Sequence, residues 1–576
     1  MRVVSFTVLL LGSAHGCTTI IVGKKASADG SVMCTHSNDG EGFQDPRLVH
    51  IPAADFPKGA MRPIFFAPES FPRYVGTARG DIPAYAVSGN QTAMKPIGHI
   101  PQISHTYGYF EETYGAMNEH QLGIGESTCS GVFGTKPLGQ GGKAMMSVDT
   151  LTQLAMERTK SSRDAVQLMG SLAETYGFYG AGSFEGSAES LLVTDPNEGW
   201  IFHILPDDTG TSAIWAAQRV PDDHIGVVAN AFMIREVNFS DTRHFLGSAS
   251  VHAVAQKKGW WKPSDGLLDF TKVYSDGEYA HKFYSGRRVW GVYNLLAPAK
   301  KFSPDYGEWR ASRPYPATAT PDKKVSVADL AAAMRSYYEG TAFDQTVGLA
   351  SGAWGTPDHV AGGSAGGKVK GNWERTIGLY RTSDSYIVQS RSWLPDATGG
   401  VLWWGPHAAP YTVYVPFLSG ARALPDATLG HPAMLNKSSL FWGVRYLANI
   451  AQLKRNRMIV EIAQLQKSVH ERALGLLAEV EAKAEAEALV GGDSRMADRV
   501  ASVLERASGH LATEVVTKLW ALTDHLMFKY ADGYVTTVSA DGALHVGSEP
   551  YPDEWLKAVG FADGPPPVPP APAAAH

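Results

Sequence analysis

A cysteine at position 17 stands at the junction between a leader-like segment and a hydrophobic run, residues 17–23. Arg2 and an apolar stretch precede it, and Ala14-His15-Gly16 has small residues where a secretory cleavage site needs them. We expect residues 1–16 to be a signal peptide, so that a β-strand must start at the very amino terminus of the mature chain. A small residue before cysteine also resembles a lipoprotein site, which would block the amine, but His15 fits that site poorly.

An amino-terminal cysteine can act as a nucleophile that carries its own base. The thiolate is the reactive form, and a free thiol has a pKa of about 8.5, whereas an α-amine has a pKa of about 7.7–8.0. The freed amine of Cys17 can therefore accept the proton of its own thiol near neutral pH. Cleavage of the leader would then activate the protein as well as export it.

Composition limits the partners and the compartment. The formal charge is −6 over 576 residues and no basic block is present, so we expect no nucleic-acid partner. The leader is shorter than the ~20 apolar residues of a membrane span, and no later stretch is long and charge-free enough. This predicts a secreted or lumenal protein. Cys34 and Cys129 either pair or are buried singly, and burial is the simpler expectation.

The sequence pattern predicts an α+β fold for residues 17–430. Short β-rich runs separated by Gly, Pro, Asn and Asp indicate strands and turns, and residues 190–194 and 199–205 form one expected hairpin. Helical spacing, opened each time by a residue that can cap a helix, occurs in residues 147–159, 162–176 and 326–338. We expect this region to be the catalytic domain.

Residues 431–560 differ in character and are expected to form a helical region packed on the catalytic domain. Residues 442–489 are rich in Ala, Glu, Leu, Gln and Lys and predict one long helix or two. A Gly-Gly pair breaks the pattern, and a second amphipathic run follows at residues 500–526. Residues 561–576 are rich in Pro and Ala and are expected to be disordered.

The first strand is expected to fold back on a second strand, residues 31–36, through a turn at Asp29-Gly30. With a loop centred near residue ~27, antiparallel pairing places Cys17 opposite about residue ~37. Asp39 then lies beside the nucleophile. A carboxylate at this place can orient the freed amine, which assigns Asp39 to the catalytic group.

Cleavage of an amide places negative charge on the carbonyl oxygen, and Asn side chains can donate to that oxygen without titrating. Asn118 lies in a turn between apolar runs, and Asn230 ends the strand-like residues 225–229. Taken alone, these surroundings favour ordinary turn residues. Their assignment as oxyanion donors needs a further argument.

That argument is a resemblance that spans nearly the whole mature chain. The motifs that carry it are Cys17-Thr18-Thr19-Ile20-Ile21-Val22-Gly23, Asp45-Pro46-Arg47-Leu48-Val49, Met117-Asn118-Glu119, Gly125-Glu126-Ser127-Thr128, Tyr284-Ser285-Gly286-Arg287-Arg288-Val289-Trp290 and Lys529-Tyr530-Ala531-Asp532-Gly533-Tyr534. With them the chain resembles the secreted N-terminal-cysteine dipeptidases. These belong to the N-terminal nucleophile (Ntn) hydrolases and are related to penicillin V acylases and bile salt hydrolases. The resemblance implies a four-layer αββα sandwich, a cysteine that frees itself, and no metal or other cofactor.

Residue by residue, the resemblance implies that Cys17 is the nucleophile, Asp39 orients its amine and Asn118 donates to the oxyanion. The expected reaction is acyl transfer from a small peptide substrate. The Cys17 thiolate attacks a dipeptide carbonyl, the amine protonates the leaving group, and water releases the acyl-enzyme.

Four further positions carry secondary assignments. Asn230 is similar to a second active-site Asn of the acylase relatives, and Arg287 or Arg288 is similar to a late active-site Arg, which we assign to Arg287. His36 departs from the pattern, because many relatives have Arg there, and its imidazole is expected near the substrate with an effect on the pH optimum. Glu126 could read the free amine of a dipeptide or be a buried structural carboxylate.

Other functions are left open by the sequence. The same scaffold could be an amidase or acylase for a non-peptide amide, or a catalytically silent secreted binding protein, and association into a homo-oligomer is open as well. Residues 362–366 match a serine-hydrolase pattern but lack the apolar strand that should precede it. Residues 362–368 approach a phosphate loop, but Val369 stands where Ser or Thr would be needed. A cysteine-type dipeptidase accounts for more of the motifs than any of these.

Overall fold

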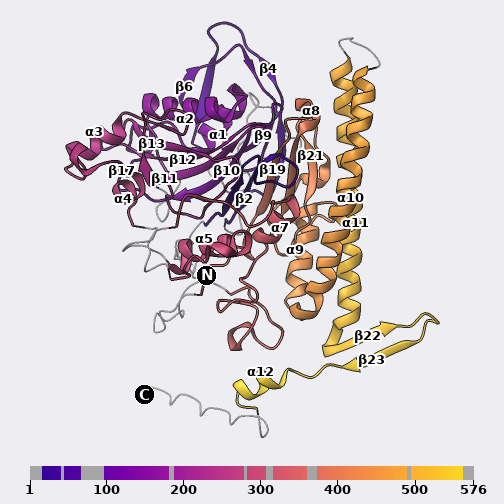
Figure 1. Cartoon of the computed structure of the whole chain (residues 1–576). Helices are drawn as coiled ribbons and strands as arrows, with labels where there is room; N and C mark the ends of the chain where they lie inside the picture. Colours follow the sequence, from indigo (N-terminus) through magenta and orange to yellow (C-terminus); the bar gives the residue numbers. More distant parts are fainter. Residues whose placement is uncertain are drawn as a thin grey trace, which may run out of the picture.

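The computed structural model describes residues 16–40, 44–66, 96–180, 187–277, 282–305, 315–359, 373–489 and 495–561. These residues form a mixed helix and sheet structure (Figure 1). The expected signal peptide apart from Gly16, the Gly-rich residues 362–368, and the expected disordered tail apart from Phe561 lie outside the described residues.

A seven-stranded antiparallel sheet contains the amino-terminal strand near its middle. Its strands, in spatial order, are β18 (Thr318–Ala319), β14 (Ile225–Val228), β1 (Thr19–Val22), β2 (Val32–Asn38), β19 (Asp384–Ser390), β20 (Gly400–Pro406) and β21 (Val415–Leu418). Strand β1 reads as a continuous apolar run because Ile20, Ile21 and Val22 are all fully buried. Strand β14 pairs with all of β1, and β2 pairs with its last two residues, Ile21 and Val22, so β1 is held from both sides.

The second large sheet has eight antiparallel strands. They are β16 (Phe245–Gly247), β13 (Ala213–Val220), β12 (Gly199–Pro206), β11 (Ala188–Thr194), β10 (Gly123–Cys129), β9 (Gly115–Asn118), β8 (Tyr109–Glu111) and β3 (Val49–Ile51). The pairing of Thr194 with Gly199 confirms the predicted hairpin of β11 and β12. Strand β2 of the first sheet contacts β10 and β11 of the second, so the two sheets meet beside the amino terminus.

Helices cover these sheets. Helices α1 (Val148–Arg158) and α2 (Ser162–Tyr176) pack against strands of the eight-stranded sheet, and α5 (Arg287–Leu296) and α7 (Val327–Met334) against strands of the seven-stranded sheet (Figure 1). The predicted helix starts are confirmed, since Ser147 caps α1 and a Ser326–Asp329 capping box opens α7. The Ntn layer order remains a prediction.

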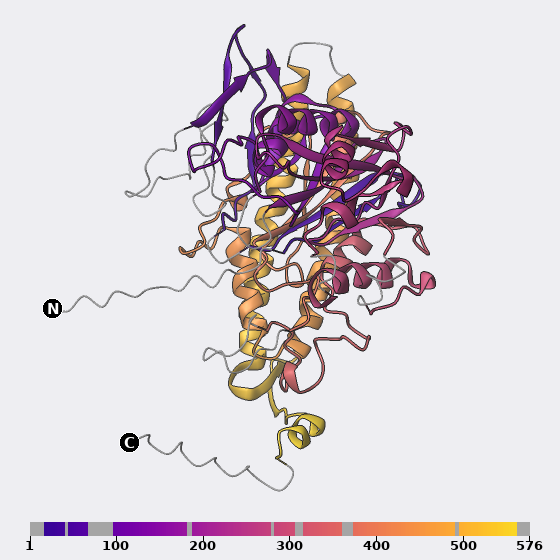
Figure 2. The same ribbon diagram turned by 90° about the vertical axis from the view of Figure 1, so that its left-hand side faces the viewer.

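The carboxy-terminal part is mainly helical. Of the two alternatives left open for residues 442–489, the structure has two helices, α9 (Leu440–Ala451) and α10 (Arg455–Leu489). Helix α11 (Met496–Tyr530) lies alongside α10. Helices α10 and α11 contact β21, and α9 contacts β20. Figure 1 shows α10 and α11 standing beside the sheets, and in the turned view of Figure 2 they run behind them. A hairpin that the sequence pattern did not predict follows, made of β22 (Tyr534–Val538) and β23 (Leu544–Ser548), and then α12 (Asp553–Ala558).

Smaller elements connect these layers. They are β4 (Ala54–Asp55), β5 (Met61–Phe65), β6 (Pro96–Pro101), β7 (His105–Thr106), β15 (Glu236–Val237), β17 (Leu268–Asp269), α3 (Ser250–Lys257), α4 (Phe270–Tyr274) and α8 (Asp396–Gly399). A π-helical turn, Lys282–Gly286, leads directly into α5.

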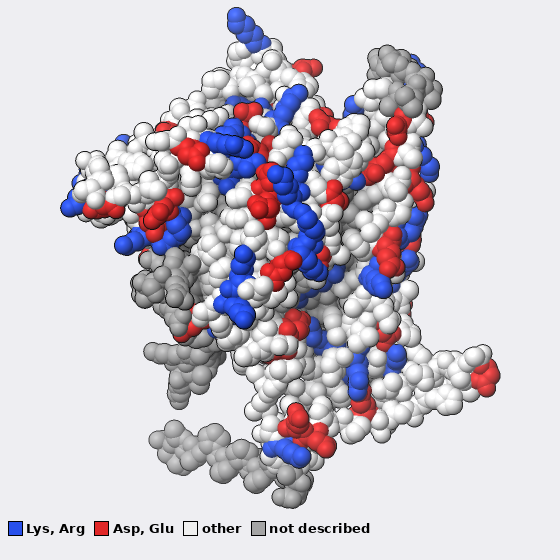
Figure 3. Space-filling model, in the orientation of Figure 1, with Lys and Arg blue, Asp and Glu red and all other residues white. Residues whose placement is uncertain are grey.

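The surface carries charges of both signs. On the face shown in Figure 3, Lys and Arg are interspersed with Asp and Glu, in keeping with the formal charge of −6. Within the described ranges, no helix combines the length and the apolar character that a membrane crossing requires.

The amino-terminal hairpin has the predicted register to within one residue. Ile21 pairs with Cys34 and Val22 with Met33, and the same register places Cys17 level with Asn38. The turn is made by Asp29, whose carboxylate accepts hydrogen bonds from Ser31, and by Gly30 with a φ of 88°. This hairpin brings the end of β2, and Asp39 after it, to the start of β1.

Candidate active site

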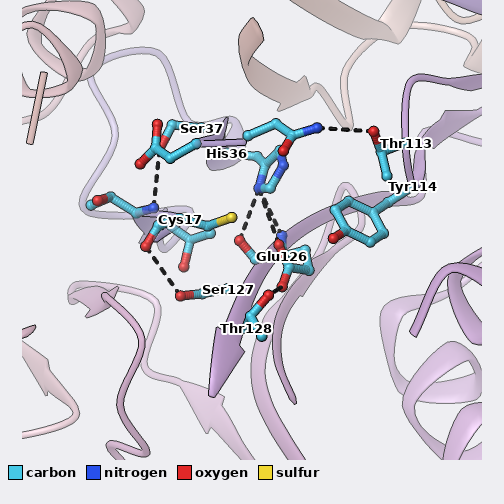
Figure 4. Close-up of polar contacts among 12 residues, drawn as sticks. Cys17, His36, Ser37, Thr113, Tyr114, Glu126, Ser127 and Thr128 are labelled. Carbon is cyan, nitrogen blue, oxygen red and sulfur yellow. Dashed lines mark hydrogen bonds and ion pairs between the residues drawn. The ribbon is translucent and has the colours of Figure 1, made fainter. Parts of the chain in front are cut away.

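Cys17 lies two residues before β1 and is enclosed, with 3% of its surface exposed. The Ser127 hydroxyl of β10 donates a hydrogen bond of 3.2 Å to the Cys17 carbonyl, and the next backbone N–H, that of Thr18, donates to the Ser37 hydroxyl at 3.0 Å (Figure 4). Both sheets therefore fix the backbone of the nucleophile candidate.

The Cys17 sulfur is surrounded by polar groups. Its Sγ, a ring nitrogen of His36 and a carboxylate oxygen of Glu126 lie within 4.8 Å of one another. Burial raises the pKa of the Cys17 thiol, and the negative charges of Glu126 and Asp39 raise it further, while a backbone hydrogen bond from Asp39 lowers it. A thiol in this setting needs a base close by before it can attack.

Asp39 lies beside the peptide bond that precedes Cys17. Its carboxylate accepts hydrogen bonds from the side chains of Ser37, Thr382 and Arg375, the first at 3.2 Å. The same Arg375 nitrogen also donates to the carbonyl of Gly16. Burial lowers the pKa of the Arg375 guanidinium, but the charge of Asp39 outweighs this effect and raises that pKa above its ordinary value. The predicted placement of Asp39 next to the amino end of β1 is confirmed.

Asn230 and Arg288 complete a network around the Cys17 backbone. The Asn230 N–H donates to the Ser127 hydroxyl at 2.9 Å, and its side-chain amide donates to the Thr128 carbonyl at 2.6 Å. Arg288 donates to the Asn230 side-chain oxygen at 2.6 Å and to the Cys17 carbonyl at 2.7 Å. An Asn amide has two N–H donors, so one can serve Thr128 and the other a substrate oxygen.

The assignment of the active-site arginine to Arg287 is corrected by the structure. The Arg287 guanidinium donates to Glu374 at 3.1 Å and to the Pro304 carbonyl at 2.7 Å, and it lies over the ring of Phe343. Consecutive residues of a helix point about 100° apart, so only one of the two arginines that open α5 can face Cys17. That residue is Arg288.

Asn118 is not brought into this network. Its side-chain oxygen accepts the N–H groups of His120 and Leu122, and its amide donates to the carbonyls of Met156 and Thr159 at 3.0 and 2.9 Å. Both amide hydrogens and the oxygen are used to tie the β9–β10 turn to the end of α1. The structure therefore gives Asn118 the turn-forming role that its local sequence favours.

His36 and Glu126 are both wholly buried next to the sulfur. His36 Nδ1 lies 2.8 Å from the Glu126 carbonyl oxygen, and its other nitrogen lies 3.7 Å from the Glu112 carboxylate. Thr128 donates to the Glu126 carboxylate at 2.7 Å. Burial raises the pKa of Glu126, while His36 and hydrogen bonds from Glu189 and Thr128 oppose that rise.

Three contributors to the site were missed from the sequence. Ser127 stands inside the quoted Gly-Glu-Ser-Thr motif, and its polar side chain was the available signal. Arg375 and Thr382 are more than 350 residues from Cys17 along the chain and have no local signal. They reach Asp39 because the segment before β19 lies next to the end of β2.

A cavity of about 390 Å³ borders the residues that hold Asp39. Arg381 and Thr382 line it, together with His407, Tyr411 and Arg445. Cys17 is not one of its lining residues.

All three cysteines lie in the described ranges, and no disulfide joins Cys34 to Cys129. Both are buried, as expected: the Cys34 sulfur contacts the Thr194 hydroxyl at 3.6 Å, and the Cys129 sulfur contacts Ser190 at 2.9 Å. Burial raises the pKa of Cys34 to about 12, which keeps that thiol inert.

Comparison with known proteins identifies a family for this chain. The chain is 25% identical over 445 residues to a probable dipeptidase of Latilactobacillus sakei, covering 76% of this chain and 81% of the relative. It is 26% identical over 432 residues to a probable dipeptidase of Salmonella dublin (72% and 84%) and 23% identical over 434 residues to dipeptidase A of Lactobacillus helveticus (74% and 80%). The family model of peptidase family C69 matches residues 16–468, starting one residue before Cys17. The family read from the motifs is thereby confirmed, and the chain belongs to peptidase family C69, whose members hydrolyse peptide bonds.

Proposed function

We propose that this protein is a secreted or lumenal cysteine-type dipeptidase with Cys17 as its amino-terminal nucleophile, built on an Ntn-hydrolase sandwich. One observation carries the proposal. The Cys17 thiol and the peptide bond before it are enclosed by Asp39, Asn230, Arg288 and Glu126, which come from distant parts of the chain. The names of the relatives agree with a dipeptidase.

Maturation begins at the Gly16–Cys17 bond. Arg375 and Arg288 both donate to the Gly16 carbonyl, the latter at 3.3 Å, so two guanidinium groups face the oxygen on which charge develops. In self-cleavage the Cys17 sulfur attacks the Gly16 carbonyl carbon and the C–N bond breaks. The amine takes up the thiol proton, and water then hydrolyses the thioester and releases the leader.

The mature enzyme uses the freed amine as its base. The amine accepts the thiol proton, and the thiolate attacks the carbonyl carbon of the substrate to form a tetrahedral intermediate. The Asn230 amide donates to its oxyanion, with its own oxygen held by Arg288. The protonated amine then gives its proton to the departing amino group. Water attacks the thioester with the same amine as base and restores the thiol.

Glu126 selects substrates with a free α-amine. Its carboxylate lies within 4.8 Å of the sulfur. In an aminoacyl group a single carbon separates the amine from the attacked carbonyl. A carboxylate this close to the sulfur therefore meets the substrate ammonium only when one residue precedes the scissile bond. Cleavage after a later residue places an uncharged amide there and leaves the buried carboxylate without its counter-charge. This favours removal of a single amino-terminal residue, the reaction that splits a dipeptide.

Free and blocked dipeptides test the proposed function. With a chain whose first residue is shown by mass to be Cys17, we expect hydrolysis of a free dipeptide. We expect at least ~30-fold lower kcat/KM for its N-acetyl form, because truncating a buried charge pair costs about 2–5 kcal/mol. Glu126→Gln should reduce this difference between the free and the blocked dipeptide, mainly by raising KM for the free dipeptide.

Two results would point elsewhere. Equal rates on both substrates would favour an amidase or acylase of broader range. No hydrolysis of either substrate, by a folded chain that begins with Cys17, would favour the catalytically silent binding protein.

Asn230 and Asn118 offer a matched comparison for the oxyanion donor. Asn230→Ala should lower kcat for dipeptides by about 10²–10³-fold with a smaller change in KM, because one donor to the transition state is lost. Asn118→Ala should instead lower the free energy of unfolding by about 1–3 kcal/mol, since it leaves backbone groups of the β9–β10 turn without partners. Steady-state kinetics and urea unfolding of both variants measure the two effects. A larger loss of kcat in Asn118→Ala would restore the assignment made from the resemblance.

A further inference from the structure

The groups around the Cys17 sulfur form a set of metal ligands. The sulfur comes from the segment just before β1, the imidazole of His36 from β2 and the carboxylate of Glu126 from β10, and Figure 4 shows the sulfur directed toward the imidazole. Thiolate, imidazole and carboxylate are the three side-chain ligands that zinc takes in proteins. All three residues are buried, so water competes little for the ion.

One of these buried ligands has an unused polar atom. Within the described part of the chain, Oε2 of Glu126 has no hydrogen-bond partner. Nε2 of His36 also lacks a hydrogen-bond partner among those residues, but it lies on the side of Glu112, 3.7 Å from that carboxylate. Such atoms are uncommon in protein interiors and call for an explanation, of which an unseen ion is one. The Glu126 oxygen lies 4.0 Å from Nδ1 of His36, so it faces the same small space as the sulfur.

Maturation adds a fourth ligand. Once the Gly16–Cys17 bond is broken, the α-amine and the thiolate of Cys17 can bind one ion together and close a five-membered ring. Tetrahedral zinc with bonds of about 2.0–2.3 Å holds its ligand atoms roughly 3.5 Å apart. The three ligand atoms now lie within 4.8 Å of one another. Shifts of these atoms by about an ångström therefore bring them to the spacing that zinc requires.

We propose that the mature active site binds Zn²⁺ as an inhibitor, through the amine and thiolate of Cys17, His36 and Glu126. Inhibition rests on the proposed function, because the ion occupies the nucleophile and its base together. The thiol proton is released to solvent as the sulfur–zinc bond forms, and removal of the ion by a chelator returns the proton and the activity. The unprocessed chain has a peptide nitrogen in place of the amine and binds the ion more weakly.

Cobalt provides a readout that does not depend on catalysis. We expect Co²⁺ added to the mature wild-type chain to produce the near-ultraviolet absorption of a cobalt–thiolate bond, and equimolar Zn²⁺ to displace it. Zn²⁺ should inhibit dipeptide hydrolysis, and EDTA should reverse the inhibition. Glu126→Gln and His36→Gln should each weaken Co²⁺ binding by at least about 10–100-fold, because the loss of a residue that only supports a ligand already costs that much.

Two control variants make the result specific. Glu236→Gln removes an exposed carboxylate, and Cys34→Ser removes a buried thiol on the same strand as His36; both should keep the wild-type absorption and affinity. Thermal unfolding of each variant shows whether it is folded.

The outcomes separate the metal site from the peptidase reaction. No cobalt–thiolate absorption in a mature chain that hydrolyses dipeptides would overturn the metal site alone. Wild-type affinity in both Glu126→Gln and His36→Gln would also overturn it, because Cys17 alone would then hold the ion. A chain with the expected absorption and no hydrolysis would contradict the dipeptidase and leave the metal site standing.

Discussion

Cys17→Ala, made in a chain that already begins at residue 17, should lower kcat/KM for dipeptides by about 10⁴-fold or more, as removal of a catalytic nucleophile does in other hydrolases. The side chain lost is small and buried, so the fold should persist with a modest loss of stability. Cys17→Ser should be nearly as inactive. A serine hydroxyl is a much weaker acid than a thiol, so far less of the nucleophilic anion forms with the same amine as base.

The matched control is Cys34→Ser. Cys34 is a buried thiol on β2 whose sulfur contacts Thr194, and burial raises its pKa to about 12. Its replacement should leave kcat/KM within about threefold of wild type, since it has no part in the acyl transfer. Stopped-flow detection of an acyl-enzyme in wild type and not in Cys17→Ala would identify the intermediate. Retention of a hundredth of the activity by Cys17→Ala would remove this residue from the mechanism.

The start of the site was predictable because it depends on short-range rules. A two-strand run with Asp29-Gly30 between its halves has few alternative registers, and the observed pairing of Ile21 with Cys34 lies one residue from the predicted register. The position of Asp39 beside Cys17 follows from that register alone. Helix starts at Ser147 and Ser326 were predictable for the same reason, because capping is a local interaction.

Other parts of the site depend on information that sequence spacing does not contain. The choice between Arg287 and Arg288 depends on the rotation of α5 about its axis, which is set by tertiary packing. Asn118 and Asn230 both follow strands, and only the structure shows that one serves a turn and the other contacts Arg288. Arg375 reaches Asp39 from more than 330 residues away, through a contact that no periodicity describes.

The helical region shows the same limit. Its composition predicts helices, but the break between Ala451 and Arg455 lies in a run of good helix formers, so composition does not mark it. The helix before the break, α9, packs on β20 and α11. The β22–β23 hairpin was missed because its strands are short and largely exposed, so they lack the alternation that marks a half-buried strand.

Gly16→Ala should slow self-cleavage of the full-length chain by at least about tenfold, although alanine is as acceptable as glycine to a secretory protease. A Cβ at residue 16 would lie 2.1 Å from the Tyr284 hydroxyl oxygen and 3.3 Å from an Arg375 nitrogen. Tyr284 cannot move without consequence, because the guanidinium groups of Arg288 and Arg375 lie over its ring at 4.7 and 5.9 Å. Displacing this ring pulls both donors away from the Gly16 carbonyl, and each donor to a developing oxyanion is worth about 10²–10³ in rate.

Intact mass of purified full-length protein, followed over time in vitro without added protease, measures this step. Gly16→Val should be slower still, since its larger side chain meets the same tyrosine. A chain made to begin at Cys17 by an external protease has no residue 16 and should be fully active, which separates a maturation defect from a catalytic one. If Gly16→Ala matures as fast as wild type, the two arginines are not the donors for self-cleavage. If only cells with a secretory protease yield Cys17 as the first residue, the leader is removed in trans, and the arginines serve the mature site alone.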